Sequence, residues 1–309
     1  MKFLLLFFLA VSAVAQSPAV LLFGGRSTPP ADTNPPVNGY TLWLHADDTT
    51  SLFTNAAGTV PADISSSDGR RIGKWLDRST VAGTNHVVMD MLPGAGQERR
   101  PWITNSNPNA FNGKPSLYFS YYGGQSQSFL NSLTNNITFG AVTGLTVFAA
   151  VTAEVNIGDA YDMIFSWNDA SAKFWELHMD NQIRQIAFWD PGNSAVELTP
   201  PIITNKVGYC YGALYFDDPN TSDNNPNTPH GSLRVSRNGN ATTTTSFLGA
   251  HLPLAGWLGI GHRGQSGSGI ANFWSGSIAE VIVYPWGLSQ LEFSNVNYYV
   301  TNKYKLHEP

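Results

Sequence analysis

The sequence predicts an all-β protein of sandwich or barrel architecture that ends in one α-helix. From Tyr40 onward, short runs of alternating apolar and polar residues are interrupted by turn residues every eight to twelve positions, a pattern typical of β-sandwiches and β-barrels. Charged residues make up only 13% of the 309 residues, whereas Gly, Asn, Ser, Thr and aromatic residues are plentiful. Near the C-terminus the alternation gives way to a helical pattern.

The first fifteen residues have the pattern of an export signal. Lys2 supplies a positive charge, Phe3 to Val11 form a short apolar core, and Ala13-Val-Ala15 matches a cleavage site with small residues. We therefore expect a signal peptide over residues 1–15 and a secreted protein after cleavage near Ala15. No later stretch reaches the roughly 18 uninterrupted apolar residues of a membrane helix, so we expect no membrane span.

Residues 16–39 are rich in proline and lack a regular period. They predict an extended N-terminal segment, within which Ala19–Phe23 would suit an edge strand. Residues 40–306 show neither a repeat of fixed period nor a second boundary, which indicates one domain. Its clearest strand candidates are Tyr40–His45, Ser116–Tyr121, Thr146–Val151, Asp162–Trp167, Phe174–Asp180, Ile183–Trp189, Tyr209–Phe216, Ser232–Arg237, Trp257–Gly261 and Gly276–Tyr284.

The predicted helix begins after Ser289. Ser289-Gln-Leu-Glu292 is a capping box, in which the serine hydroxyl and the glutamate carboxylate each bind a backbone N–H at the helix start. An apolar stripe at spacings of three and four then predicts an amphipathic helix that packs on the sandwich; it comprises Phe293, Val296, Val300 and Tyr304.

Charge and cysteine content exclude several classes. The 17 basic and 22 acidic residues give a net charge of −5 without a basic cluster, so we expect no nucleic-acid partner. Cys210 is the only cysteine, which rules out an internal disulfide. It lies in an alternating run without a nearby base in the sequence, so we expect a packed, inert thiol.

A family resemblance is carried by an ordered series of segments along the chain. The segments are Tyr40–Asp47, Gly73–Ser79, Asn112–Phe119, Leu145–Val151, Ser232–Gly239, Phe273–Tyr284, Leu288-Ser289 and Tyr298–Leu306. Together they resemble, in order, the LamG-like jelly-roll (concanavalin A-like lectin/glucanase) family of secreted bacterial proteins. The similarity covers Tyr40 to Leu306, and its most specific part is the closing strand and helix from Phe273 onward.

This resemblance implies a two-sheet antiparallel jelly-roll sandwich with a concave face and a C-terminal amphipathic helix. It does not imply one activity, because such folds occur in lectins, adhesion modules, glycoside hydrolases and polysaccharide lyases.

One predicted hairpin combines aromatic and polar side chains on a single face. If Phe174–Asp180 and Ile183–Trp189 are joined by a two-residue turn, position 180 pairs with 183, 178 with 185, 176 with 187 and 174 with 189. Trp175, Leu177 and Met179 then face the core with Ile186 and Phe188. The opposite face carries Phe174, Glu176, His178, Asp180, Ile183, Gln185, Ala187 and Trp189.

This second face suits a glycan ligand, because aromatic rings stack on sugar C–H faces while carboxylate, amide and imidazole groups bind hydroxyls. The predicted ligand-binding residues are Phe174, Glu176, His178, Asp180, Gln185 and Trp189, and the predicted partner is a polysaccharide or cell-surface glycan. The alternative is an ordinary solvent-facing sheet surface. The favoured hypothesis is thus a secreted carbohydrate-binding or adhesion module without turnover.

A polysaccharide-cleaving enzyme is the alternative function, with Glu176, His178 and Asp180 as catalytic residues. Two residues four apart on a strand have Cα atoms about 13 Å apart. Their side chains would have to lean together to reach the roughly 5 to 9.5 Å that separates the carboxyl groups of glycoside hydrolases. A lyase would instead use His178 as a proton shuttle, with Gln185 as its cross-strand neighbour.

Three further features complete the candidate list. Asp47 and Asp48 are weak calcium candidates, since such an acidic pair is more often a turn or cap, and we expect no other cofactor. Gly261-His-Arg263 lies at a strand end and indicates a turn. Most tryptophans belong to strand-like runs, which leaves the roles of Trp102, Trp167 and Trp286 open.

Overall fold

The computed structural model describes most of one compact unit, Asn34–Pro309, whereas Met1–Thr33 lies outside the described residues. The predicted signal peptide and the Ala19–Phe23 strand therefore fall outside it. The described ranges are 34–63, 71–79, 87–88, 100–104, 110–120, 130–132, 144–154, 161–168, 174–180, 185–189, 195–197, 207–217, 229–238, 241–248, 256–263 and 272–306.

One of the two sheets, sheet A, has eight strands in the order β15-β14-β13-β8-β17-β6-β5, with β1 also paired to β17. The long strands β8 and β17 lie at its centre, and β1 and β6 pair with successive parts of one edge of β17. The strands are β1 (Leu42–His45), β5 (Trp102–Thr104), β6 (Ser116–Phe119), β8 (Gly144–Ala153), β13 (Gly208–Asp217), β14 (Pro229–Arg237), β15 (Ala241–Leu248) and β17 (Gly276–Tyr284).

The other sheet, sheet B, has nine strands in the order β12-β11-β10-β9-β16-β7-β4-β3-β2. All strand pairs within both sheets are antiparallel. The strands are β2 (Leu52–Phe53), β3 (Lys74–Trp75), β4 (Val87–Val88), β7 (Leu130–Ser132), β9 (Tyr161–Asn168), β10 (Phe174–Asp180), β11 (Gln185–Trp189), β12 (Ala195–Glu197) and β16 (Trp257–Ile260). A 3-10 turn, η1 (Thr49–Ser51), precedes β2.

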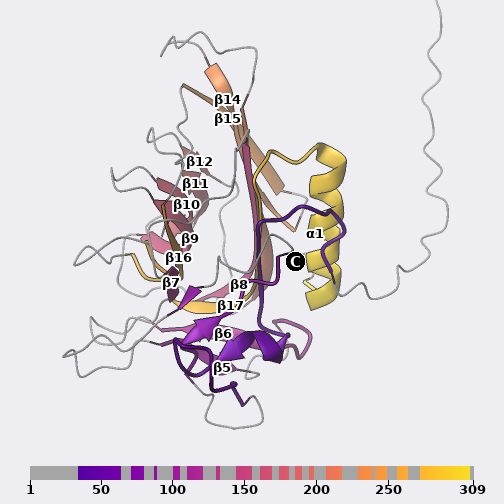
Figure 1. Ribbon diagram of the computed structural model, residues 1–309. Helices are drawn as coiled ribbons and strands as arrows, with labels where there is room; N and C mark the ends of the chain where they lie inside the picture. The colour runs from indigo at the N-terminus through magenta and orange to yellow at the C-terminus, as the bar shows by residue number, and fades with distance from the viewer. Residues whose placement is uncertain are drawn as a thin grey trace, which may run out of the picture. The chain divides into compact units, whose positions relative to one another are not determined.

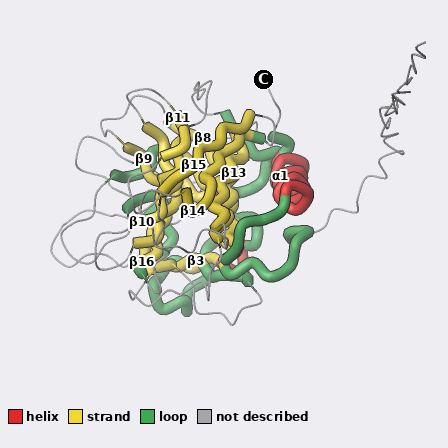
Figure 2. The backbone as a smooth tube through the Cα atoms, turned by 90° about the horizontal axis from the view of Figure 1, so that it is seen from above, coloured by secondary structure: helices red, strands yellow, loops and turns green. Residues whose placement is uncertain are grey.

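The two sheets face each other across one apolar core, and a second core lies between sheet A and α1 (Gln290–Tyr304). Figures 1 and 2 show α1 on the side of sheet A that faces away from sheet B. Along β8, Leu145, Val147 and Ala149 belong to the core between the sheets, whereas Phe148 and Ala150 belong to the helix-side core. Strand alternation thus supplies both cores from one strand.

The predicted all-β sandwich and its C-terminal helix are confirmed. α1 has the complete Ser289–Glu292 capping box, and the four residues of the predicted stripe are buried. Within the described part of the chain, no helix combines the length and apolarity needed to cross a bilayer. The described end of the proline-rich segment runs along the helix-side core, where the Val37 carbonyl accepts a hydrogen bond from the Tyr284 hydroxyl at 3.1 Å.

The predicted register of the β10–β11 hairpin is wrong by two residues. Asp180 pairs with Gln185, His178 with Ala187 and Glu176 with Trp189, so four residues rather than two separate the strands. The physical reason is the turn sequence: a two-residue hairpin turn favours Asn-Gly or Asp-Gly because both positions need positive φ, and Gln182 follows Asn181 here. A shift of two preserves the division of residues between the faces.

Candidate functional site

Strand pairing assembles the predicted face on sheet B. The core between the sheets includes Trp175, Leu177 and Met179 of β10 and Trp167 of β9. Because side chains alternate along a strand, Glu176 lies on the opposite, outer face of β10. Its neighbours across the sheet are Ser166 on β9 and Trp189 on β11. The next row places Asn168 between Phe174 and Trp257. The outer face therefore brings together, in register, polar residues and three aromatic positions from four strands.

Glu176 is held by Arg263, which follows β16. The guanidinium Nε donates to Glu176 Oε1 at 2.5 Å, and Nη2 donates to Oε2 at 3.0 Å. The glutamate side chain is only 1% exposed, whereas that of Arg263 is 26% exposed. Burial raises the pKa of the Glu176 carboxyl, and the guanidinium opposes that rise. The pair thus connects a buried carboxylate with a cation that reaches solvent.

Arg263 was not among the predicted site residues. Gly261-His-Arg263 has the pattern of an ordinary turn, and the partner of Arg263 lies 87 residues away in the chain. The only signal available in the sequence is the position of an arginine at the end of a strand. Gly261 does make the turn, with φ of 76°, and its N–H donates to the Ile164 carbonyl of the neighbouring strand at 3.0 Å.

His178 is buried on the same strand as Glu176 and is 1% exposed. Burial and, secondarily, the charge of Arg263 lower the pKa of His178 to about 3. The imidazole is therefore neutral at physiological pH. His262, next to Arg263, is also fully buried, and burial lowers its pKa to about 3 against two opposing backbone hydrogen bonds.

The other predicted ligand-binding residues are placed by their backbone alone. Phe174, Asp180, Gln185 and Trp189 occupy the paired positions given above, and their side chains lie outside the described part of the structure. Of the three tryptophans left open, Trp167 is fully buried in the core between the sheets, and Trp102 lies under the Arg71 guanidinium and contacts the tilted ring of Tyr118. Trp286 packs edge-on against Tyr284 beside the helix-side core.

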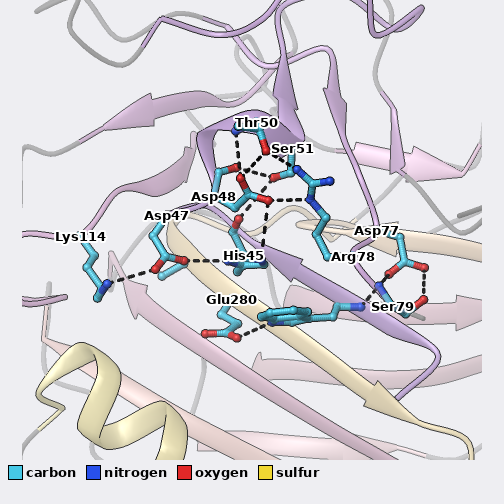
Figure 3. Close-up of polar contacts among 12 residues, drawn as sticks. His45, Asp47, Asp48, Thr50, Ser51, Asp77, Arg78, Ser79, Lys114 and Glu280 are labelled. Carbon is cyan, nitrogen blue, oxygen red and sulfur yellow. Dashed lines mark hydrogen bonds and ion pairs between the residues drawn. The ribbon is translucent and has the colours of Figure 1, made fainter. Parts of the chain in front are cut away.

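A second polar cluster lies where β1 ends, and it includes the two calcium candidates (Figure 3). Asp47 accepts a hydrogen bond from His45 at 2.9 Å and pairs with Lys114 at 3.1 Å and Lys303 at 3.2 Å. Burial by itself raises the pKa of Asp47, but the His45 hydrogen bond and the Lys303, His45 and Lys114 charges together hold it well below its usual range.

Asp48 has a capping role. Its Oδ1 accepts from the Thr50 N–H at 3.0 Å at the start of η1, and its Oδ2 pairs with Arg78 at 2.6 Å. The two carboxylates thus have protein cations as partners. Among the described residues, no group of three or more His, Cys, Asp or Glu side chains is arranged to hold a metal ion. The geometry favours a cap at Asp48 and ion pairing at Asp47 over a calcium site.

Neither a family model nor a curated protein matches the chain. Among solved structures, the chain is similar to the CBM40 of Ruminococcus gnavus IT-sialidase bound to α2,3-sialyllactose, with 15% identity, a TM-score of 0.39, and coverage of 51% of this chain and 84% of that one. Trypanosoma rangeli sialidase in complex with sialic acid has 15% identity, a TM-score of 0.44, and coverage of 87% and 34%.

The receptor-binding domain of botulinum neurotoxin type G has 10% identity, a TM-score of 0.47, and coverage of 84% of this chain and 51% of that one. The chain thus spans about a third of the sialidase and half of the toxin domain. The functional interpretation therefore depends on the geometry of the chain itself.

Proposed function

We propose that the protein is a secreted glycan-binding or adhesion module that binds its ligand on the outer face of sheet B, around Arg263 and Glu176. The proposal of secretion comes from residues 1–15 and the LamG-like resemblance from residues 40–306. The observation that carries the binding proposal is the bidentate pair between a buried carboxylate and a partly exposed guanidinium.

Such a pair suits recognition of hydroxyl groups. Glu176 fixes the guanidinium plane, so little side-chain entropy is lost when a ligand binds to it. Asn168 and Trp257 belong to the adjacent row, and Trp257 is partly exposed. A sugar on this face would meet the oriented guanidinium of Arg263 and the partly exposed ring of Trp257, a cation and an aromatic surface of the kind that carbohydrates bind.

Binding without turnover is favoured over cleavage by the same contacts. Both oxygens of Glu176 already accept hydrogen bonds from Arg263, which leaves this carboxylate poorly suited to act as an acid or a nucleophile. His178, with a pKa of about 3, is too weak a base to remove a proton efficiently at neutral pH.

The test is a glycan array with the purified protein, followed by calorimetric titration of the best ligand. We expect Arg263→Lys, which keeps the charge and loses the bidentate geometry, to weaken binding about tenfold, or about 1.4 kcal/mol. The control is Lys305→Met, at an exposed position at the end of the C-terminal helix, which should leave affinity unchanged.

Turnover is measured on the same ligands by assays for new reducing ends and unsaturated products. Product that disappears in Glu176→Gln would establish the enzymatic alternative and overturn the binding proposal. Equal affinity of Arg263→Lys and the unmodified protein would show that the ligand binds elsewhere.

A further inference from the structure

α1 packs on the face of sheet A that is turned away from sheet B (Figure 1). Its buried residues pack on β8 and β13 in the helix-side core. The approach is close at Gly212, where a Cβ atom would lie 2.5 Å from Phe293 Cζ, so a larger residue there would force the phenylalanine ring to shift.

One lysine of α1 enters a cage of carboxylates and aromatic rings. Lys303 Nζ lies 2.9 Å from Glu280 Oε2 and 3.2 Å from Asp47 Oδ1, and it donates to the Tyr299 hydroxyl at 3.2 Å. It also lies 6.0 Å from the ring centroid of Trp43 and 5.1 Å from that of Tyr304. Cation–π attraction and two ion pairs therefore act on the same ammonium group.

The cage joins the helix to the sheet. Glu280 and Trp43 come from paired strands of sheet A, and the Trp43 indole N–H donates to Glu280 Oε1 at 2.6 Å. A β-bulge in β17 between Ile278 and Glu280 breaks the alternation, so that Ala279 and Glu280 both face α1. Without the bulge, the glutamate would point into the apolar core between the sheets.

Glu280 depends on this lysine for its charge balance. Its side chain is 1% exposed, that of Lys303 is 11% exposed, and among the described residues Lys303 is the cation paired with it. The remaining partners, Trp43 and Tyr299, are neutral donors. Asp47 keeps His45 and Lys114 when Lys303 is absent, whereas Glu280 becomes an uncompensated buried carboxylate.

We propose that Lys303 is the anchor that keeps α1 docked on sheet A, and that loss of its charge allows α1 to undock locally while the two sheets remain folded. The apolar stripe of α1 provides the contact area with the sheet, and the ion pairs of the Lys303 ammonium group determine where on the sheet the helix docks. This proposal is independent of glycan binding on sheet B.

Cys210 provides a direct reporter of undocking. It is the only cysteine of the chain, it is buried in the helix-side core, and burial, together with the charge of Glu280, raises the pKa of its thiol well above the usual range. Exposure to water would restore an ordinary thiol pKa and make the group reactive. The rate of Cys210 alkylation under native conditions therefore measures how often α1 leaves the sheet.

The experiment compares Cys210 alkylation in the unmodified full chain, Lys303→Met and Lys305→Met. Lys305 is the matched control because it is exposed at the end of the same helix and contacts Asn302 rather than a carboxylate. We expect Lys303→Met to accelerate alkylation at least tenfold and Lys305→Met to leave it within twofold. Amide exchange in β8 and β17 should remain as slow as in the unmodified protein.

A second variant separates the anchor from a general loss of stability. Adding Glu280→Gln to Lys303→Met removes the uncompensated charge, so alkylation should return toward the original rate. Equal alkylation rates for Lys303→Met and Lys305→Met would overturn the proposal. It would also be overturned if exchange in β8 and β17 accelerated in parallel with alkylation, because helix and sheets would then open as one unit.

Discussion

Sheet B and the helix side of sheet A each bury a glutamate against a cation, but the surroundings of the two pairs differ. Glu280 accepts hydrogen bonds from three side chains, and its lysine is 11% exposed and shared with Asp47. Glu176 accepts both of its side-chain bonds from Arg263, which is 26% exposed. The Glu280–Lys303 pair is enclosed by other side chains, whereas the Glu176–Arg263 pair reaches solvent through its arginine.

This difference is the reason for proposing a structural role for the Glu280 pair and a binding role for the Glu176 pair. A buried charge with many partners contributes to stability and to the position of an element, because removal of one partner leaves the others unsatisfied. A buried carboxylate that orients a partly exposed guanidinium fixes the direction of that cation, which is what the proposed binding role requires. The two pairs should therefore respond differently to the same substitutions.

The largest expected effect is on stability, in Glu280→Ala. Removal of this carboxylate leaves Lys303, which is 11% exposed, without its closest partner and Trp43 without its acceptor, so we expect the free energy of unfolding to fall by about 3–5 kcal/mol. Glu176→Ala should cost less, because Arg263 can turn its guanidinium into water. Denaturant unfolding of both variants measures the comparison, and a larger loss for Glu176→Ala would reverse it.

The next effect is a difference in pH dependence between the two regions. In the folded protein His178 and His262 each have a pKa of about 3 and stay neutral above that pH, whereas an unfolded histidine has a pKa of about 6.5. Between these values the unfolded state binds more protons, so stability falls as pH decreases, by at most about 1.4 kcal/mol per pH unit for each histidine. The stability that Asp47 contributes through its lowered pKa is lost only below about pH 4.

Unfolding free energies measured from pH 7 to pH 3 test whether the histidines and Asp47 lower stability in different pH ranges. His178→Gln should reduce the slope between pH 6 and pH 4, and Asp47→Asn should leave that slope unchanged. An unchanged slope in His178→Gln would mean that the histidine is protonated in the folded state.

The smallest effect concerns α1 alone. Ser289→Ala removes the hydroxyl that accepts the Glu292 N–H, so we expect a loss of about 1 kcal/mol, typical of an N-cap. Thermal unfolding followed by circular dichroism measures it, with the exposed Ser294→Ala on the same helix as the comparison. A loss as large as that of Glu280→Ala would mean that the helix depends on its cap rather than on its docking contacts.

Individual elements show how far the sequence predicts this fold. β10 and β17 have the bounds that alternation predicts, and the capping box locates the start of α1. The short strands β2, β3 and β4 were missed because two residues carry no period. β15, with four consecutive threonines, was missed because it has no apolar alternation, and its pairing with β14 defines it instead.

The candidate site was predicted only in part, for a similar reason. Alternation assigned Glu176 and His178 to the same face of the strand, and the structure keeps them there. The register places Trp189 opposite Glu176, whereas the prediction paired Trp189 with Phe174. The turn length and the partner Arg263 were not predictable, since neither follows from a local pattern. Burial also differs from the expected open surface, because Glu176 and His178 are at most 1% exposed.

The all-β class, the C-terminal helix and the packed state of Cys210 were predictable from the sequence alone, because each follows from local periodicity, capping or composition. The partners of the charged residues are known only from the tertiary structure. Arg263 reaches Glu176 and Lys303 reaches both Glu280 and Asp47 across strands and across a helix interface. Such contacts depend on how distant segments fold against one another, and a bulge of one residue in β17 was enough to place Glu280 beneath α1.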